Sequence, residues 1–266
     1  LYNRGSQEQH FIERGRFSVN LKLLNWNVWV FNKEIERVIR FLVEQDADVI
    51  CLQEVSAPLL ERLTRDTEYS LFKARDAYHK RDGDRSPSFL VIMTRYRVVG
   101  ADTILFKRQK KRILLARLLG IEEGIEFQYA DILCWEKRAR FFNVHLECVA
   151  GPKRRMAQFD EVTRVFQGGV NIICGDLNIL RAWYAFFLRL IFGSWDELWE
   201  REHAFFARVF GKHNLWNIFE VAVNHGLTGK QLDYVLAPKE MKVISQNVFS
   251  DPIGSDHNPI LVEFQM

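Results

Sequence analysis

Val170-Asn171-Ile172-Ile173-Cys174-Gly175-Asp176-Leu177-Asn178 is an apolar run that ends in a turn carrying two short polar side chains. The run predicts a buried strand over Val170–Cys174, because it is short, rich in β-branched residues and bounded by glycine. The turn Gly175–Asn178 then presents a carboxylate and an amide at the end of that strand. Such strand ends place polar groups around one rim of a sheet, where loops on a rigid scaffold form sites.

Strands of the same kind recur along the chain, with helices between some of them. Residues 33–45 carry apolar side chains at helical spacing and predict an amphipathic helix. A second helix is expected to open at Gly151-Pro152 and to end at Gly168-Gly169, and the polar stretch 73–87 predicts a loop. The predicted strands are 19–23, 48–52, 89–93, 126–134, 139–146, 170–174, 232–236 and 260–264. We expect 232–236 and 260–264 to be the last two strands of the chain.

Composition describes a globular protein. The chain has 266 residues, of which 48% are hydrophobic and 27% charged, so disorder is excluded as its main state. A formal net charge of +3 is too small to indicate nucleic-acid binding by itself. No stretch reaches the roughly 18 uncharged apolar residues of a membrane span. We expect residues 1–18 to form an N-terminal extension and residues 19–266 one domain, because no linker rich in Pro, Gly or Ser interrupts them.

The four cysteines are dispersed and form no CxxC pair, which fits a reducing compartment. A cytoplasmic location is therefore the expectation. A signal removed before Leu1, with secretion or peripheral membrane attachment, stays an alternative.

Polar residues of one chemical kind follow the predicted strands. Carboxylates and amides, with no cysteine and no paired histidine among them, favour Mg²⁺ or Mn²⁺ over Zn²⁺. Two histidines are left for proton transfer and charge stabilisation, so the set suits attack of water on a phosphate ester. The set comprises Asn27, Glu54, His145, Asp176, Asn178, Asp233, Asp256 and His257.

Six segments, in order, resemble the motifs of the endonuclease/exonuclease/phosphatase superfamily. They are LNWNV (24–28), LQEV (52–55), NVHLE (143–147), GDLN (175–178), LDYVL (232–236) and GSDHNPI (254–260). Any one of them is a weak signal, but six in order are specific. The resemblance covers roughly residues 19–266 and implies a four-layer α/β sandwich, with two mixed sheets face to face and helices outside. It also implies Mg²⁺-dependent (or Mn²⁺-dependent) phosphoesterase chemistry.

By motif match, the resemblance assigns roles to the polar set. Glu54 would be the main metal ligand, and Asp256 would lie near or on the metal. Asn27 would support the groups around the metal or the phosphate. The water-activating residue is Asp176, helped by Asn178.

The same match pairs Asp233 with His257, which contacts the phosphoryl group. It makes His145 a phosphate ligand or the acid that protonates the leaving oxygen. Some family members carry an acidic residue where this chain has Trp29, so we expect one tight metal ion rather than two.

Two further segments bear on the substrate. The basic run at 107–112 includes Lys110, Lys111 and Arg112, and the aromatic segment 181–219 includes Trp195, Trp199 and Trp216. These six residues are candidates for substrate binding, through phosphate contact and base stacking or through an anionic membrane surface. A solvated charged face and aromatic core packing are the structural alternatives.

The favoured function is a metal-dependent phosphodiesterase, a nuclease or DNA-end-processing enzyme with nucleic acid as its partner. The segment HLE and the helix after it are loosely similar to the tyrosyl-DNA phosphodiesterases of the superfamily. An alternative is a phospholipid, sphingolipid or inositol-phosphate phosphoesterase at a membrane surface. A third reading, a catalytically dead binding module, conflicts with the complete polar set.

Overall fold

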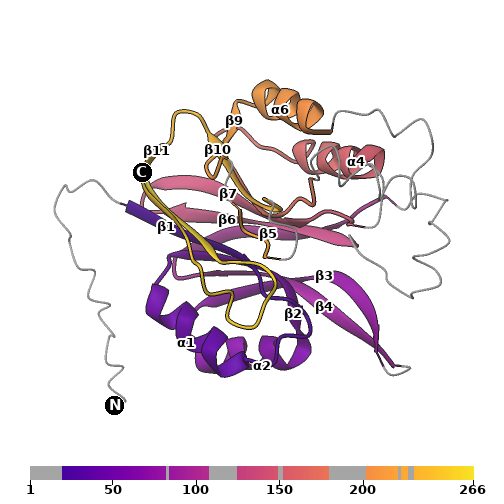
Figure 1. Cartoon of the computed structure of the whole chain (residues 1–266). Coiled ribbons are helices and arrows are strands. Elements are labelled where there is room, and N and C mark those ends of the chain that lie inside the picture. Colours follow the sequence, from indigo (N-terminus) through magenta and orange to yellow (C-terminus); the bar gives the residue numbers. More distant parts are fainter. Residues whose placement is uncertain are drawn as a thin grey trace, which may run out of the picture.

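The fold is seen in a computed structural model that describes residues 20–81, 84–107, 125–148, 152–179, 202–220, 223–226 and 231–266 (Figure 1). Within these ranges two six-stranded sheets form the centre of the molecule. None of the described helices has both the length and the apolar character that a membrane crossing requires.

The first sheet has the order β11-β12-β1-β2-β4-β3 and contains both the first and the last described strands. Only β1 and β2 pair in parallel, and the other neighbours are antiparallel. Its strands are β1 (Asn20–Asn27), β2 (Val49–Ser56), β3 (Ser70–Arg81), β4 (Asp84–Thr94), β11 (Lys242–Val248) and β12 (Ile260–Gln265).

The second sheet has the order β5-β6-β7-β8-β10-β9 and the same mixed character. Here β7 and β8 form the parallel pair. Its strands are β5 (Arg97–Leu105), β6 (Glu126–Cys134), β7 (Lys137–His145), β8 (Val170–Asp176), β9 (Leu215–Asn217) and β10 (Asp233–Pro238).

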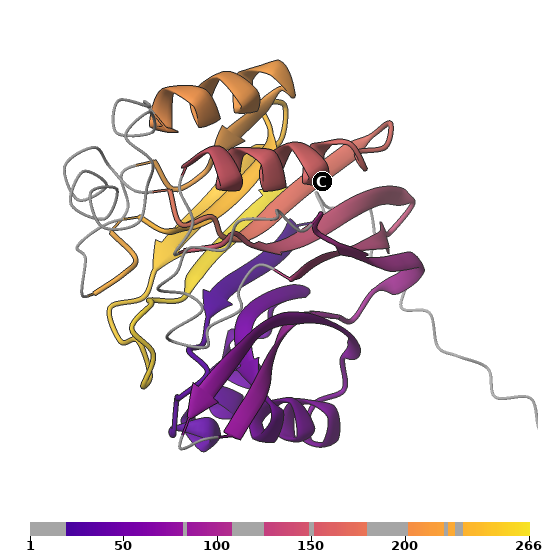
Figure 2. The same cartoon turned by 90° about the vertical axis from the view of Figure 1, so that its right-hand side faces the viewer.

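Helices cover the outer face of each sheet, which makes the four layers visible in Figures 1 and 2. α1 (Ile35–Gln45) and α2 (Ala57–Asp66) pack on the first sheet, and α4 (Pro152–Thr163) and α6 (Glu202–Lys212) pack on the second. A third apolar cluster, which includes Leu23, Phe141 and Val235, fills the space between the sheets. The predicted four-layer α/β sandwich with two mixed sheets is confirmed.

Local sequence accounts for the helices. α1 buries Val38, Ile39, Phe41 and Leu42, which lie on one side of the helix at three- and four-residue spacing. α2 begins after Ser56, whose side chain accepts a hydrogen bond from the backbone N–H of Leu59, an N-cap that satisfies one of the helix's free amides.

The two parallel strand pairs bring the polar strand ends together. Asn27 is in register with Gln53 in one sheet, and His145 is in register with Asp176 in the other. Gly175 precedes Asp176 with φ of +145°, and a Cβ atom there would lie 1.8 Å from the carbonyl oxygen of Val144. Only glycine therefore allows β8 to approach β7 this closely.

Two sequence predictions about secondary structure are wrong. Residues 73–81 and 84–87 are not loop but the adjoining parts of β3 and β4, whose polar residues mask an alternation that exposes Lys73 and Arg75 and buries Ala74 and Asp76. A further strand, β11, lies between the two expected at the end of the chain. It is an exposed edge strand, so it lacks the apolar run that marks a buried one.

Candidate active site

The carboxylate of Asp176, at the end of β8, is the point on which several predicted site residues converge. Its Oδ2 lies 3.2 Å from Nδ2 of Asn27, 3.6 Å from Nε2 of His257 and 3.8 Å from Nε2 of His145. Its Oδ1 accepts a hydrogen bond of 2.9 Å from the backbone N–H of Asn178. Burial raises the pKa of Asp176, although the two histidines act in the opposite direction.

Each of the two histidines is held by a carboxylate of its own. Nδ1 of His257 lies 2.7 Å from Oδ2 of Asp233, and Nδ1 of His145 lies 2.9 Å from Oδ1 of Asp76. In both cases the other ring nitrogen faces Asp176. Asp233 is the register partner of Asp176 in the antiparallel pair of β10 and β8, so the two carboxylates share a face of the sheet.

The carboxylates favour the charged state of both imidazoles. Burial alone would lower the pKa of His257, but Asp233 and then Asp176 outweigh it and raise that pKa to about 10. Burial likewise opposes the charge on His145, yet Asp76, Asp176 and Glu54 together raise the pKa of His145 well above 6.5. Both rings therefore offer an N–H donor towards Asp176.

Asp76 is the site residue that the sequence analysis missed. It is fully buried beside a bulge of β3 and accepts hydrogen bonds from the backbone N–H of Glu54 (2.8 Å) as well as facing His145. Asp76 is on the inward-facing side of a strand with alternating exposure, and this alternation is the sequence pattern that could have identified it. The prediction of a loop over residues 73–87 concealed the pattern.

Glu54 and Asn27 form the other wall of the site. Glu54 lies at a bulge of β2 with φ of +54° and is half-buried. Oε1 of Glu54 accepts from Nδ2 of Asn27 (3.0 Å), and the same amide nitrogen reaches Asp176. Because Oδ1 of Asn27 accepts from the backbone N–H of Trp29 (3.1 Å), the amide group is oriented with its donor towards both carboxylates.

Asp256 lies at the rim of the cluster. Its Oδ1 is 3.9 Å from Nε2 of His257, and its Oδ2 is 3.5 Å from Nε2 of His225. The sequence analysis did not single out His225 and found no paired histidine. The structure corrects this, because the rings of His225 and His257 lie edge to face with centroids 4.4 Å apart.

Of the six predicted substrate-binding residues, five lie outside the described residues: Lys110, Lys111, Arg112, Trp195 and Trp199. Trp216 is described, is half-buried on β9 and packs against the core between the sheets.

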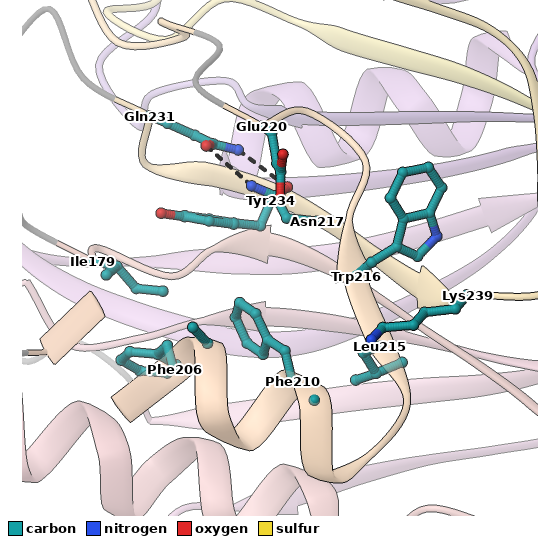
Figure 3. A pocket seen from close by; sticks show the side chains of 12 residues that line it. Ile179, Phe206, Phe210, Leu215, Trp216, Asn217, Glu220, Gln231, Tyr234 and Lys239 are labelled. Atoms are coloured by element: carbon teal, nitrogen blue, oxygen red, sulfur yellow. Dashed lines mark hydrogen bonds between the residues drawn. The ribbon is translucent and has the colours of Figure 1, made fainter. Parts of the chain in front are cut away.

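Trp216 also lines a pocket of about 390 Å³ between α6 and the β9–β10 pair (Figure 3). The pocket has an apolar wall, which includes Phe206 and Phe210, and a polar side where Asn217 and Gln231 hydrogen-bond to each other. Ile179, which lines the pocket, directly follows the site residue Asn178 in the sequence.

The chain matches a known protein family. The model of the Endonuclease/Exonuclease/phosphatase family matches residues 24–257. No curated protein sequence matches the chain significantly.

Solved structures share the fold. An endonuclease/exonuclease/phosphatase from Beutenbergia cavernae matches with a TM-score of 0.71 and 14% identity, covering 93% of this chain and 72% of that one. Humanized D. rerio TDP2 has a TM-score of 0.64 and 17% identity, with coverage of 93% and 99%. The mannosyl-6-phosphatase of Bacteroides thetaiotaomicron has a TM-score of 0.66 and 15% identity, with coverage of 92% and 100%. At such identities the likeness establishes the fold alone.

Proposed function

Because the chain belongs to the endonuclease/exonuclease/phosphatase family, we propose that it is a phosphoester hydrolase that requires a divalent metal ion. One observation carries the proposal: two histidines, each held by its own carboxylate, both direct Nε2 towards the buried carboxylate of Asp176. This arrangement supplies a base and two proton donors, which are groups that attack of water on a phosphate ester needs.

The donor set fits Mg²⁺ or Mn²⁺. The carboxylates of Glu54 and Asp256 are oxygen donors, and the five carboxyl groups of the cluster outnumber its two facing histidines. In our assignment Glu54 and Asp256 hold the ion, and Asn27 orients Glu54 through its amide nitrogen. The ion, when bound, stabilises negative charge on the phosphoryl oxygens. With Trp29 at the position of a possible further acidic ligand, we propose one ion rather than two.

Different side chains of the protein then accept and donate the protons of the reaction. Asp176 orients the attacking water and accepts its proton, while the backbone N–H of Asn178 fixes the carboxylate by its Oδ1 atom. His257 donates to a phosphoryl oxygen, and its charge is maintained by Asp233. His145, charged in the same way by Asp76, protonates the leaving oxygen.

Nucleic acid is the substrate class that we favour, with a phosphodiester as the bond cleaved. Support comes from the fold shared with D. rerio TDP2, which has been solved in complex with a single-strand DNA product (TM-score 0.63, 15% identity). Trp216 and the pocket it lines would supply an aromatic surface for a base.

A substrate screen tests the proposal directly. The protein would be assayed with Mg²⁺ or Mn²⁺ against single-stranded and duplex DNA, RNA, lipid vesicles and inositol phosphates. We expect metal-dependent hydrolysis of oligonucleotides, abolished by EDTA without loss of the circular dichroism spectrum. Glu54→Gln should raise the Mg²⁺ concentration needed for half-maximal rate. Full activity in EDTA, with metal verified absent, would refute metal dependence. Cleavage of lipid alone would show that the substrate is a lipid and not nucleic acid.

A further inference from the structure

His225 and His257 face each other across a short antiparallel bridge that lies outside the named strands. The backbone N–H of Gly226 donates to the carbonyl of Asp256 (2.9 Å), and that of Asn258 donates to the carbonyl of Asn224 (2.8 Å). These two bonds flank the histidines, which makes them a non-hydrogen-bonded pair, the arrangement in which opposite side chains come closest. The backbone therefore holds the two imidazoles together.

A carboxylate completes this pair. Oδ2 of Asp256 lies 3.5 Å from Nε2 of His225, and Oδ1 of Asp256 lies 3.9 Å from Nε2 of His257. The ligating atoms of all three side chains lie within 4.8 Å of one another. Four-coordinate Zn²⁺, with bonds of about 2.0–2.1 Å to nitrogen and oxygen, needs ligand atoms about 3.3–3.5 Å apart, so only a small inward movement is required.

The surroundings of the three side chains are those of a metal site. Asp233 already binds Nδ1 of His257, and a carboxylate on the far ring nitrogen is the usual partner that orients a metal-bound histidine. Both histidines are buried, whereas 29% of the Asp256 side chain is exposed, which gives an ion a route from solvent.

We infer that His225, His257 and Asp256 form a binding site for a transition-metal cation of the Zn²⁺ class, and that its occupation inhibits hydrolysis. Two imidazoles and one carboxylate select Zn²⁺ or Co²⁺ over Mg²⁺, which prefers oxygen donors. The ion displaces the proton on Nε2 of His257, which is released to solvent. The predicted inhibition rests on the proposed function, because a bound Zn²⁺ would occupy His257 and Asp256 and so prevent them from acting in hydrolysis. The predicted metal binding does not depend on the proposed function.

The experiment measures binding without any substrate. Full-length, metal-free protein would be titrated with Co²⁺, whose visible absorption reports tetrahedral nitrogen and oxygen ligation, and Zn²⁺ would then displace it. We expect His225→Ala to weaken Co²⁺ and Zn²⁺ binding by at least about tenfold, the smallest loss expected when even a supporting partner is removed. His225→Gln is a second variant that keeps the side-chain volume.

The matched control is His213→Ala, which removes a histidine that directly follows α6 and packs against Phe166. It should bind Co²⁺ like the wild type. A second measurement adds Zn²⁺ to protein turning over substrate in saturating Mg²⁺, with each rate expressed relative to the same protein's rate in Mg²⁺ alone. The wild type should be inhibited, and both His225 variants should resist inhibition.

The outcomes separate the two proposals. Unaltered Co²⁺ binding in His225→Ala and His225→Gln would overturn the site, since the alternative group of Asp176, Asp233 and His257 lacks His225. Absence of hydrolysis by the wild type would instead count against the proposed function and leave the Co²⁺ result intact. Binding that is lost in the variants without relief of Zn²⁺ inhibition would refute the regulatory part alone.

Discussion

Nδ1 of His145 lies 2.9 Å from Oδ1 of Asp76, although the two residues are 69 positions apart and belong to different sheets. Asp76 also accepts the backbone N–H of Glu54, so one buried carboxylate fixes the bulge that carries the proposed metal ligand and the ring of the proposed acid. The contact joins the two halves of the sandwich at the candidate site.

Replacing Asp76 by Asn should lower the pKa of His145, because the amide keeps the shape but removes the charge that stabilises the imidazolium. An NMR titration of the His145 ring in the metal-free protein measures this directly. If His145 is the acid that protonates the leaving oxygen, kcat should fall by about 10²-fold or more. Asp102→Asn, an exposed change on β5, is the control. An unaltered His145 titration would show that Asp76 does not set its charge.

Asp76 and Asp176 show how much of the candidate site could be predicted from the sequence. Asp176 follows a continuous apolar strand and a glycine, so its position at a strand end was readable from the chain alone. The alternation of β3 marks Asp76 as inward-facing, but its contact with His145 depends on the opposite sheet, and no local pattern encodes that contact. The pairing of His225 with His257 is of the same kind, since it arises from a bridge between two segments without strand-forming sequence.

Asp176→Asn should lower kcat by at least about 10²-fold, the low end for a positioned acid–base group. The amide preserves the hydrogen bond from the backbone N–H of Asn178 but neither accepts a proton from water nor carries a charge. Steady-state kinetics in saturating Mg²⁺ measure the loss, with circular dichroism to verify the fold. Activity within threefold of wild type would remove Asp176 from its role.

The ion pair of Asp233 and His257 makes stability depend on pH. The folded-state pKa of His257 is about 10, above the ordinary value of 6.5, so its stabilising contribution is complete below about pH 6.5 and is lost as pH rises towards 10. Asp233→Asn should weaken this dependence, because Asp176 still faces His257. Urea unfolding of the metal-free wild type and variant at pH 6, 8 and 10 tests it: the difference in unfolding free energy should shrink with rising pH. A constant difference would contradict the assigned charge state.

Trp216→Ala tests the aromatic surface. If Trp216 stacks on a base, its loss should cost about 1–3 kcal/mol of binding and raise KM on oligonucleotides. The rate on a small chromogenic phosphodiester should stay nearly unchanged, because a small ester does not reach the pocket. Equal losses on both substrates would mean that Trp216 acts only through its packing against the core, which a parallel urea titration quantifies.

Glu202→Gln probes the buried ion pair that joins α6 to α4. Nε of Arg155 lies 2.7 Å from Oε1 of Glu202, and the two side chains are 2% and 1% exposed. Removing one charge leaves the guanidinium buried and only partly compensated, so the free energy of unfolding should fall by about 3–5 kcal/mol. Arg155 also donates to the carbonyls of Glu147 and Cys148, close after His145, so the loss should extend to kcat.

The matched control for this change is Asp160→Asn on α4, the helix that carries Arg155, which breaks the exposed pair with Arg164. Solvent screens that pair, so its loss should cost no more than about 1 kcal/mol and should diminish in high salt. The loss in Glu202→Gln should persist in high salt, because the buried pair is shielded from ions. Urea unfolding of both variants at low and high salt separates the two cases, and similar small losses in both would contradict a structural role for the Arg155–Glu202 pair.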